Sequence, residues 1–143
     1  MNLSTFSAIL TFALDTEDRS IAFLEKLIIR KDGIAVRPTL EEIIQVKKKH
    51  RRTLETIRRE NITEMILEPV RNLKAADFPS EIPQKEVKTL ADGIQAVLDA
   101  ETTASRFLLT ASEKLNLAEV AKALKRLQTA KEDLIGKIKM LQA

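Results

Sequence analysis

Apolar side chains recur every three or four residues along four long stretches of this chain, which is the period of an amphipathic helix. Each stripe of this kind must bury one helix face against a neighbour. The stretches span about residues 4–30, 39–68, 86–114 and 117–142. The 143 residues include only 3 Gly and 4 Pro, too few for the many tight turns of a β-sandwich or barrel. The sequence therefore predicts an all-α fold.

The boundaries of the first two stretches carry residues that start or stop helices. Ser4 is the predicted N-cap of the first helix, which ends at Lys31-Asp32-Gly33. Thr39 and Glu42 have the spacing of a capping box at the start of the second helix. Pro69 ends that helix because a proline cannot continue the hydrogen-bond ladder.

Residues 69–85 interrupt the helical pattern and contain three of the 4 prolines. We interpret them as a crossover between two helical hairpins, about 4–68 and 86–142, since neither hairpin is long enough to bury its own apolar face. The sequence thus predicts one domain over residues 1–143, a four-helix bundle of two helical hairpins joined by a long crossover. A simple up-down bundle is the alternative.

The two halves of the chain align without a gap when position 13 is matched to position 97. Ala13-Leu14-Asp15-Thr16-Glu17 then matches Val97-Leu98-Asp99-Ala100-Glu101, and Phe23-Leu24 matches Phe107-Leu108. Farther along, Lys47 matches Lys131. This similarity predicts a duplicated helical hairpin with an approximate two-fold axis.

Four charged residues interrupt the apolar stripes, one on each predicted helix: Glu17, Lys47, Glu101 and Lys131. An isolated charge in a core is costly or loses its charge. Two carboxylates and two ammonium groups at one level can satisfy each other, so we predict a structural core charge cluster, with His50 as an added hydrogen-bond partner. The alternative is that the lysines extend along their stems to solvent.

Glu17 followed by Phe23-Leu24, and Glu101 followed by Phe107-Leu108, make this pattern resemble the rubrerythrin branch of the ferritin-like family. In that family helices 1 and 3 each carry a Glu seven residues before the Tyr of a Phe-Tyr pair. Helices 2 and 4 each carry Glu-x-x-His, and together these residues hold two irons. Lys47-Lys48-Lys49-His50 and the segment starting at Lys131 fall where the Glu-x-x-His motifs would be. The resemblance implies a ferritin-like bundle.

The departures from the family's motif concern its metal site. Leu24 and Leu108 stand where the family has Tyr, Lys47 and Lys131 where it has Glu, and Leu134 where it has one His. A protonated Lys has no lone pair and repels a dication. We therefore predict a degenerate di-iron site with no cofactor, no metal and no catalytic residue, in a non-enzymatic protein with a structural or protein-interaction role. The alternative is a rubrerythrin-like metal-binding oxidoreductase using Glu17, His50 and Glu101.

A run of basic residues on the second predicted helix offers another function. Its outward positions form a basic surface: Lys48, Lys49, Arg52 and Arg59. Such a surface could bind nucleic acid or an anionic membrane surface. No aromatic residue interleaves with the run to stack on bases, and Glu55 and Glu60 lie at helical spacings from it. We therefore expect a solvated face and no nucleic-acid partner.

Composition excludes several classes of site. The chain has no Cys and 1 His, so disulfides, thiol catalysis and sites built on several imidazoles are excluded. No stretch of about 18 apolar residues predicts a membrane span. The apolar residues 1–14 lack the basic leading region of a signal peptide and precede Asp15, so we expect a cytoplasmic protein. A homodimer or another protein partner is a further hypothesis, since related bundles often pair along helix faces.

Overall fold

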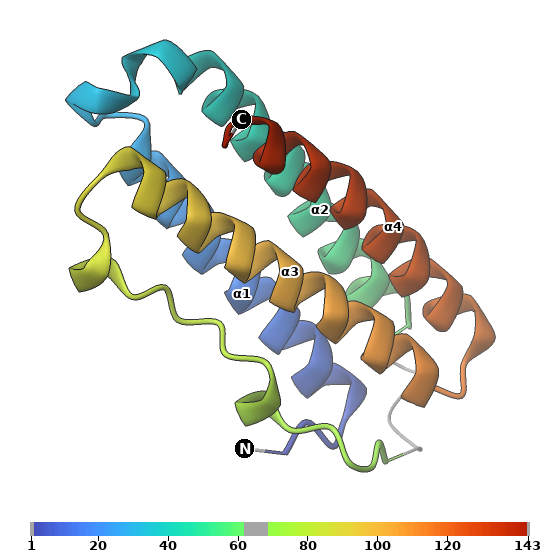
Figure 1. Cartoon of the computed structure of the whole chain (residues 1–143). Helices are drawn as coiled ribbons and strands as arrows, with labels where there is room; N and C mark the ends of the chain where they lie inside the picture. The colour runs from blue at the N-terminus through green and yellow to red at the C-terminus, as the bar shows by residue number, and fades with distance from the viewer. Residues whose placement is uncertain (1, 62–68, 143) are drawn as a thin grey trace.

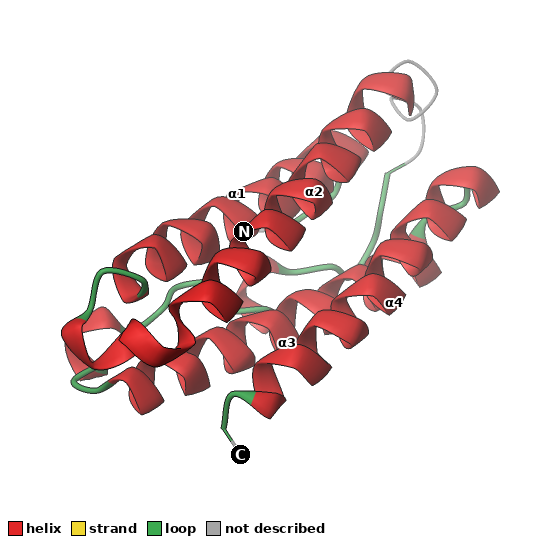
Figure 2. Cartoon of the chain, turned by 90° about the horizontal axis from the view of Figure 1, so that it is seen from above, coloured by secondary structure: helices red, strands yellow, loops and turns green. Residues whose placement is uncertain are grey.

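Four long α-helices make up most of the molecule (Figure 1). The computed structural model describes residues 2–61 and 69–142. The helices are α1 (Phe6–Leu27), α2 (Arg37–Asn61), α3 (Leu90–Lys114) and α4 (Ala118–Met140). Helices and loops are the only elements in these described ranges, with no β-strand among them (Figure 2). The prediction of an all-α chain with four helices is confirmed.

The helices pack as a four-membered bundle. α1 lies against both α2 and α3, and α4 lies against both α3 and α2. The bundle therefore has one face formed by α1 and α3 and an opposite face formed by α2 and α4. None of the helices in the described ranges has the length and apolar composition needed to cross a membrane.

The start of α1 differs slightly from the prediction, and the start of α2 differs more. Thr5, rather than Ser4, caps α1, and its side chain accepts a hydrogen bond from the Ala8 amide at 3.0 Å. A 3₁₀-helix over Lys31–Val36 leads directly into α2. Thr39 therefore lies inside α2, and the predicted capping box with Glu42 is wrong. The sequence signal was misleading because a preceding helical turn supplies the acceptors that a cap would otherwise provide.

Two further boundaries of the predicted helices lie at the end of α2 and at the start of α3. The predicted continuation of the second helix through residues 62–68 lies outside the described residues. α3 begins at Leu90 instead of Glu86, because Thr89 forms a capping box with Asp92. The Thr89 side chain accepts from the Asp92 amide at 3.1 Å, and the Asp92 carboxylate accepts from the Thr89 amide at 3.2 Å. This reciprocal pair fixes the first turn of α3.

Residues 69–89 run alongside α1 from its N-terminal to its C-terminal end (Figure 1). The Val70 amide donates to the Ser4 carbonyl at 2.8 Å, and Lys26 donates to Gln84 at 3.0 Å. Phe78 is buried and packs edge-to-face on Phe107 of α3, with ring centroids 5.1 Å apart. The segment therefore covers the face formed by α1 and α3.

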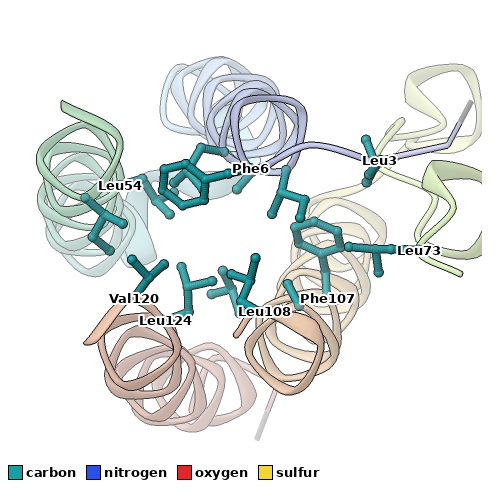
Figure 3. Close-up of a cluster of buried hydrophobic side chains, with 14 of the residues drawn as sticks. Leu3, Phe6, Leu54, Leu73, Phe107, Leu108, Val120 and Leu124 are labelled. Atoms are coloured by element: carbon teal, nitrogen blue, oxygen red, sulfur yellow. The ribbon is translucent and has the colours of Figure 1, made fainter. Parts of the chain in front are cut away.

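The core has two apolar clusters separated along the bundle axis. The first lies toward the N-terminus of α1 and includes the residues labelled in Figure 3: Leu3, Phe6, Leu54, Leu73, Phe107, Leu108, Val120 and Leu124. The second lies toward the C-terminus of α1 and includes Leu24, Leu40, Ile43, Val97, Leu134 and Ile138. In the sequence of each helix, a charged residue stands between the residues that it gives to the two clusters.

Candidate functional site

A layer of four charged side chains separates the two apolar clusters, with one residue from each helix: Glu17, Lys47, Glu101 and Lys131. At most 1% of the surface of any of these residues is exposed. Each stands three or four residues from buried apolar neighbours, such as Leu14 and Ile21 beside Glu17 on α1. That spacing turns the charge toward the same interior face as the apolar side chains.

The four side chains form a closed ring of ion pairs, hereafter the charge ring. Lys47 Nζ lies 2.8 Å from Glu17 Oε2 and also bonds to Glu101 Oε1. Lys131 Nζ lies 3.1 Å from Glu101 Oε2 and also pairs with Glu17 Oε1. Each carboxylate bridges both ammonium groups, and each of its oxygens has its own lysine partner. The ring has no formal net charge, and the lysines do not extend to solvent.

The ion pairs hold Lys47 and Glu101 of the ring in their charged forms. Burial alone would lower the pKa of Lys47, but the attraction of Glu101 and Glu17 outweighs it and raises this pKa. Burial alone would raise the pKa of Glu101, but Lys131 and Lys47 outweigh it and lower this pKa to about 2. Near neutral pH Lys47 is therefore protonated and Glu101 ionised, and neither is poised to transfer a proton.

His50 lies close to the ring without joining it. It is 5% exposed, and its Nδ1 atom is buried with no hydrogen-bond partner in the described part of the chain. The Nδ1 atom of His50 therefore makes none of the hydrogen bonds to the cluster that the sequence predicted. Burial, and then the positive charge of Lys131, lower the pKa of His50 to about 4. A third cation would upset the balance of the ring, so the imidazole is neutral at pH 7.

The donor set does not suit a metal ion. Among the described residues, no three His, Cys, Asp or Glu side chains are grouped closely enough to hold one. All four carboxylate oxygens of Glu17 and Glu101 already face ammonium groups. A metal held by Glu17, His50 and Glu101 would have to displace both lysines and leave two buried cations unpaired, which is costly.

An apolar pocket that sequence reasoning missed reaches the ring from the covered face. Its lining includes Phe12, Phe78 and Phe107, together with Glu17 and Lys131 of the ring. Phe12 and Phe107 pack with ring centroids 4.8 Å apart. The only sequence signal was Asp77-Phe78-Pro79, an apolar side chain in a stretch that lacks periodicity. Phe78 thus contributes to closing the covered side of the ring.

The predicted basic surface lies on α2, where Lys49, Arg52 and Arg59 are exposed and Lys48 is half-buried. Sequence reasoning missed that α4 extends it, because the two helices are far apart in the chain. Arg126 of α4 and Lys49 of α2 line the same groove. The predicted pairing with Glu55 is made by Arg51, which also donates to Asp18 of α1.

Comparison with known proteins identifies no relative. No family model, no curated protein and no solved structure matches this chain.

Proposed function

We propose that this chain is a non-catalytic ferritin-like bundle with a structural or protein-interaction role, in which the charge ring replaces a di-iron site. Two helical hairpins would be joined by a long crossover that includes residues 69–89. The lysines would occupy the space of the two metal ions of the family that the sequence resembles.

One observation carries the proposal: every carboxylate oxygen of Glu17 and Glu101 pairs with an ammonium group. In a di-iron site those oxygens face two cations, and the remaining helices supply further carboxylates and imidazoles. Here α2 and α4 supply the cations themselves. The charge of the core is balanced without a metal, and the redox chemistry that iron would bring has no ligand set.

The ring would serve to align the four helices. A buried ion pair adds little net stability compared with apolar packing. A wrong alignment of the helices, however, would leave its charges buried without a partner, which is costly. A shift of one helix by a single turn, about 5.4 Å, would separate a lysine from both carboxylates. The ring would therefore favour one register of the bundle and a well-defined outer surface for partners.

Metal analysis tests the proposal. Wild-type protein purified without added metal should contain far less than one iron, manganese or zinc ion per chain. A Lys47→Glu/Lys131→Glu variant would place four carboxylates beside His50. Because four like charges repel in a core, this variant should be largely unfolded alone and should fold on binding Mn²⁺ or Fe²⁺, as followed by circular dichroism.

The matched control is Lys47→Gln/Lys131→Gln, which removes both cations without adding carboxylates and should gain no metal-dependent folding. Stoichiometric metal in the wild-type protein would contradict the loss of the metal site. If the double Glu variant bound no metal, the ring would not occupy the position of a di-iron site.

A further inference from the structure

The two opposite faces of the bundle differ in whether another segment of the chain covers them. On the face of α1 and α3, the chain's own residues 69–89 lie over the helices and bury Phe78. On the face of α2 and α4, no described segment lies across the helices, and a groove of about 520 Å³ runs between them. A volume of this size can accept several side chains of a bound segment.

The lining of this groove is amphipathic. Its floor is apolar and includes Val46 of α2 and Leu127, Ala130 and Leu134 of α4, while buried His50 lies among them. The exposed charged side chains of its rim are Lys49, Arg126, Asp133 and Lys137. Lys137 is paired with Glu42 at 2.7 Å, whereas Lys49 and Arg126 form no ion pair within residues 2–61 and 69–142. Asp133 forms no ion pair in those residues either, so the uncompensated charge of the rim is +1 in sum.

The charge of whole helices follows the same division. Without the four mutually paired residues of the charge ring, α2 carries 7 basic and 4 acidic residues and α4 carries 5 and 3, so their formal sum is +5. On the same basis α1 and α3 each carry 2 basic and 3 acidic residues, a sum of −2. This asymmetry is hidden in the overall charge of +3. The field outside the open face attracts acidic partners and steers their approach.

We propose that the groove between α2 and α4, hereafter the cationic groove, binds an acidic segment of a partner protein through apolar anchors. The anchors would lie on the floor at Leu127, Ala130 and Leu134. Flanking carboxylates would pair with Lys49 and Arg126. The covered face offers the structural precedent, since a segment without α-helix lies there with its Phe78 side chain buried beneath Arg106, which also donates to the Asp77 carbonyl. The proposal specifies the interaction role proposed above and rests on it.

Other occupants fit the groove less well. A nucleic acid would find positive charge but no aromatic side chain to stack on, and an apolar floor that its phosphates cannot use. A membrane surface cannot enter a concave groove, and the most exposed large apolar side chains, Ile29, Ile34 and Met140, do not line it. A second copy would have to present its acidic face, which residues 69–89 already cover in part.

The test uses a capped, fluorescently labelled peptide with the sequence Glu-Glu-Phe-Glu-Glu-Leu-Glu-Glu and the complete chain. Its anisotropy should report binding that weakens as salt is added. Two control peptides separate the contribution of charge from that of the apolar anchors. One has Lys in place of every Glu, and the other has Ala in place of Phe and Leu. Each should bind at least about tenfold more weakly, a difference of about 1.4 kcal/mol. The signals of His50, the only histidine in the chain, should shift in NMR spectra on peptide binding.

Matched variants locate the binding site. Lys49→Glu/Arg126→Glu should weaken peptide binding at least about tenfold, whereas Lys85→Glu, an exposed reversal in the segment that covers the other face, should leave it nearly unchanged. Circular dichroism confirms that each variant is folded. Failure of the acidic peptide to bind, or equal loss in both variants, would overturn the proposal.

Three further arms test the other occupants. Tighter binding of a single-stranded oligonucleotide or of phosphatidylserine vesicles would overturn the proposal, as would self-association that Lys49→Glu/Arg126→Glu abolishes. The metal analysis above is independent of all these arms, so a failed peptide experiment leaves the proposed replacement of the di-iron site unaffected.

Discussion

The charge ring and the apolar clusters on either side of it both fill the core between the four helices, but they do so with different interactions. In the clusters, side chains such as Leu10 and Leu124 are fully buried and gain stability from every apolar contact in any direction. In the ring, each charge depends on two particular partners on two other helices. The comparison indicates that the clusters supply most of the stability, whereas the ring determines which residues stand level with one another.

Loss of one ring charge should have the largest effect. Lys131→Met strands one oxygen each of Glu17 and Glu101 in the core, so the free energy of unfolding should fall by about 3–5 kcal/mol. Urea titration followed by far-ultraviolet circular dichroism measures it, since the chain has no Trp or Tyr for fluorescence. Glu17→Gln should act in the same direction. A loss below about 1 kcal/mol in both would mean that the ring is not buried as a unit.

Loss of one apolar side chain should lower the free energy of unfolding nearly as much as loss of a ring charge. The two kinds of substitution should differ when each is combined with a second substitution of its own kind. Leu124→Ala leaves a cavity in the first cluster and should cost about 2–5 kcal/mol. Adding a distant Ile138→Ala in the second cluster should give a nearly additive loss, because the two sites share no partners. Adding Glu101→Gln to Lys131→Met should cost much less than the sum of the two single changes. Equal additivity in both pairs would remove the distinction between ring and clusters.

Protonation of His50, which lies close to the ring, should lower the free energy of unfolding by an intermediate amount. Its pKa is about 4 in the folded protein against an ordinary value of 6.5. Between these values the unfolded chain binds a proton that the folded chain does not, so stability falls as the pH falls from 6.5 toward 4, by roughly 1–3 kcal/mol in all. Urea titrations at pH 7 and pH 5 should show part of this loss in the wild type. They should show less in His50→Gln, and an equal loss in both would contradict the assignment.

An exposed ion-pair network should show the smallest effect. Arg51 pairs with Asp18 and Glu55 on the surface, where water and salt screen the attraction. Arg51→Ala should therefore lower the free energy of unfolding by no more than about 1 kcal/mol, and added salt should reduce the difference. The same urea titration with and without salt measures it. A cost equal to that of Lys131→Met would show that burial does not distinguish the ring.

Much of the ring could be predicted from the sequence because each of its members is a charged residue within the apolar stripe of a single helix. Glu17 and Lys47 each interrupt an apolar stripe, and the matching of the two halves places Glu101 and Lys131 at the same level. A helical stripe fixes which way a side chain points, and opposite charges at one level must pair. The ring geometry then follows from four helices of similar register.

The parts that sequence reasoning missed depend on contacts between distant segments. The position of Phe78 on Phe107 has no local pattern behind it, and neither does the groove that brings Lys49 next to Arg126. The predicted start of α2 at Thr39 was wrong because the 3₁₀-helix that precedes α2 makes a cap at Thr39 unnecessary. His50 has the spacing of a ring member, but its orientation depends on packing between α2 and α4.

The most direct test of the charge ring replaces all four of its residues at once. The variant Glu17→Leu/Lys47→Met/Glu101→Leu/Lys131→Met leaves no stranded charge and keeps a similar volume in the layer. Its free energy of unfolding in urea should equal that of the wild type or exceed it by about 1–4 kcal/mol, although each single change is destabilising. A quadruple variant less stable than every single variant would contradict the aligning role of the ring, because the ring would then be the main source of stability.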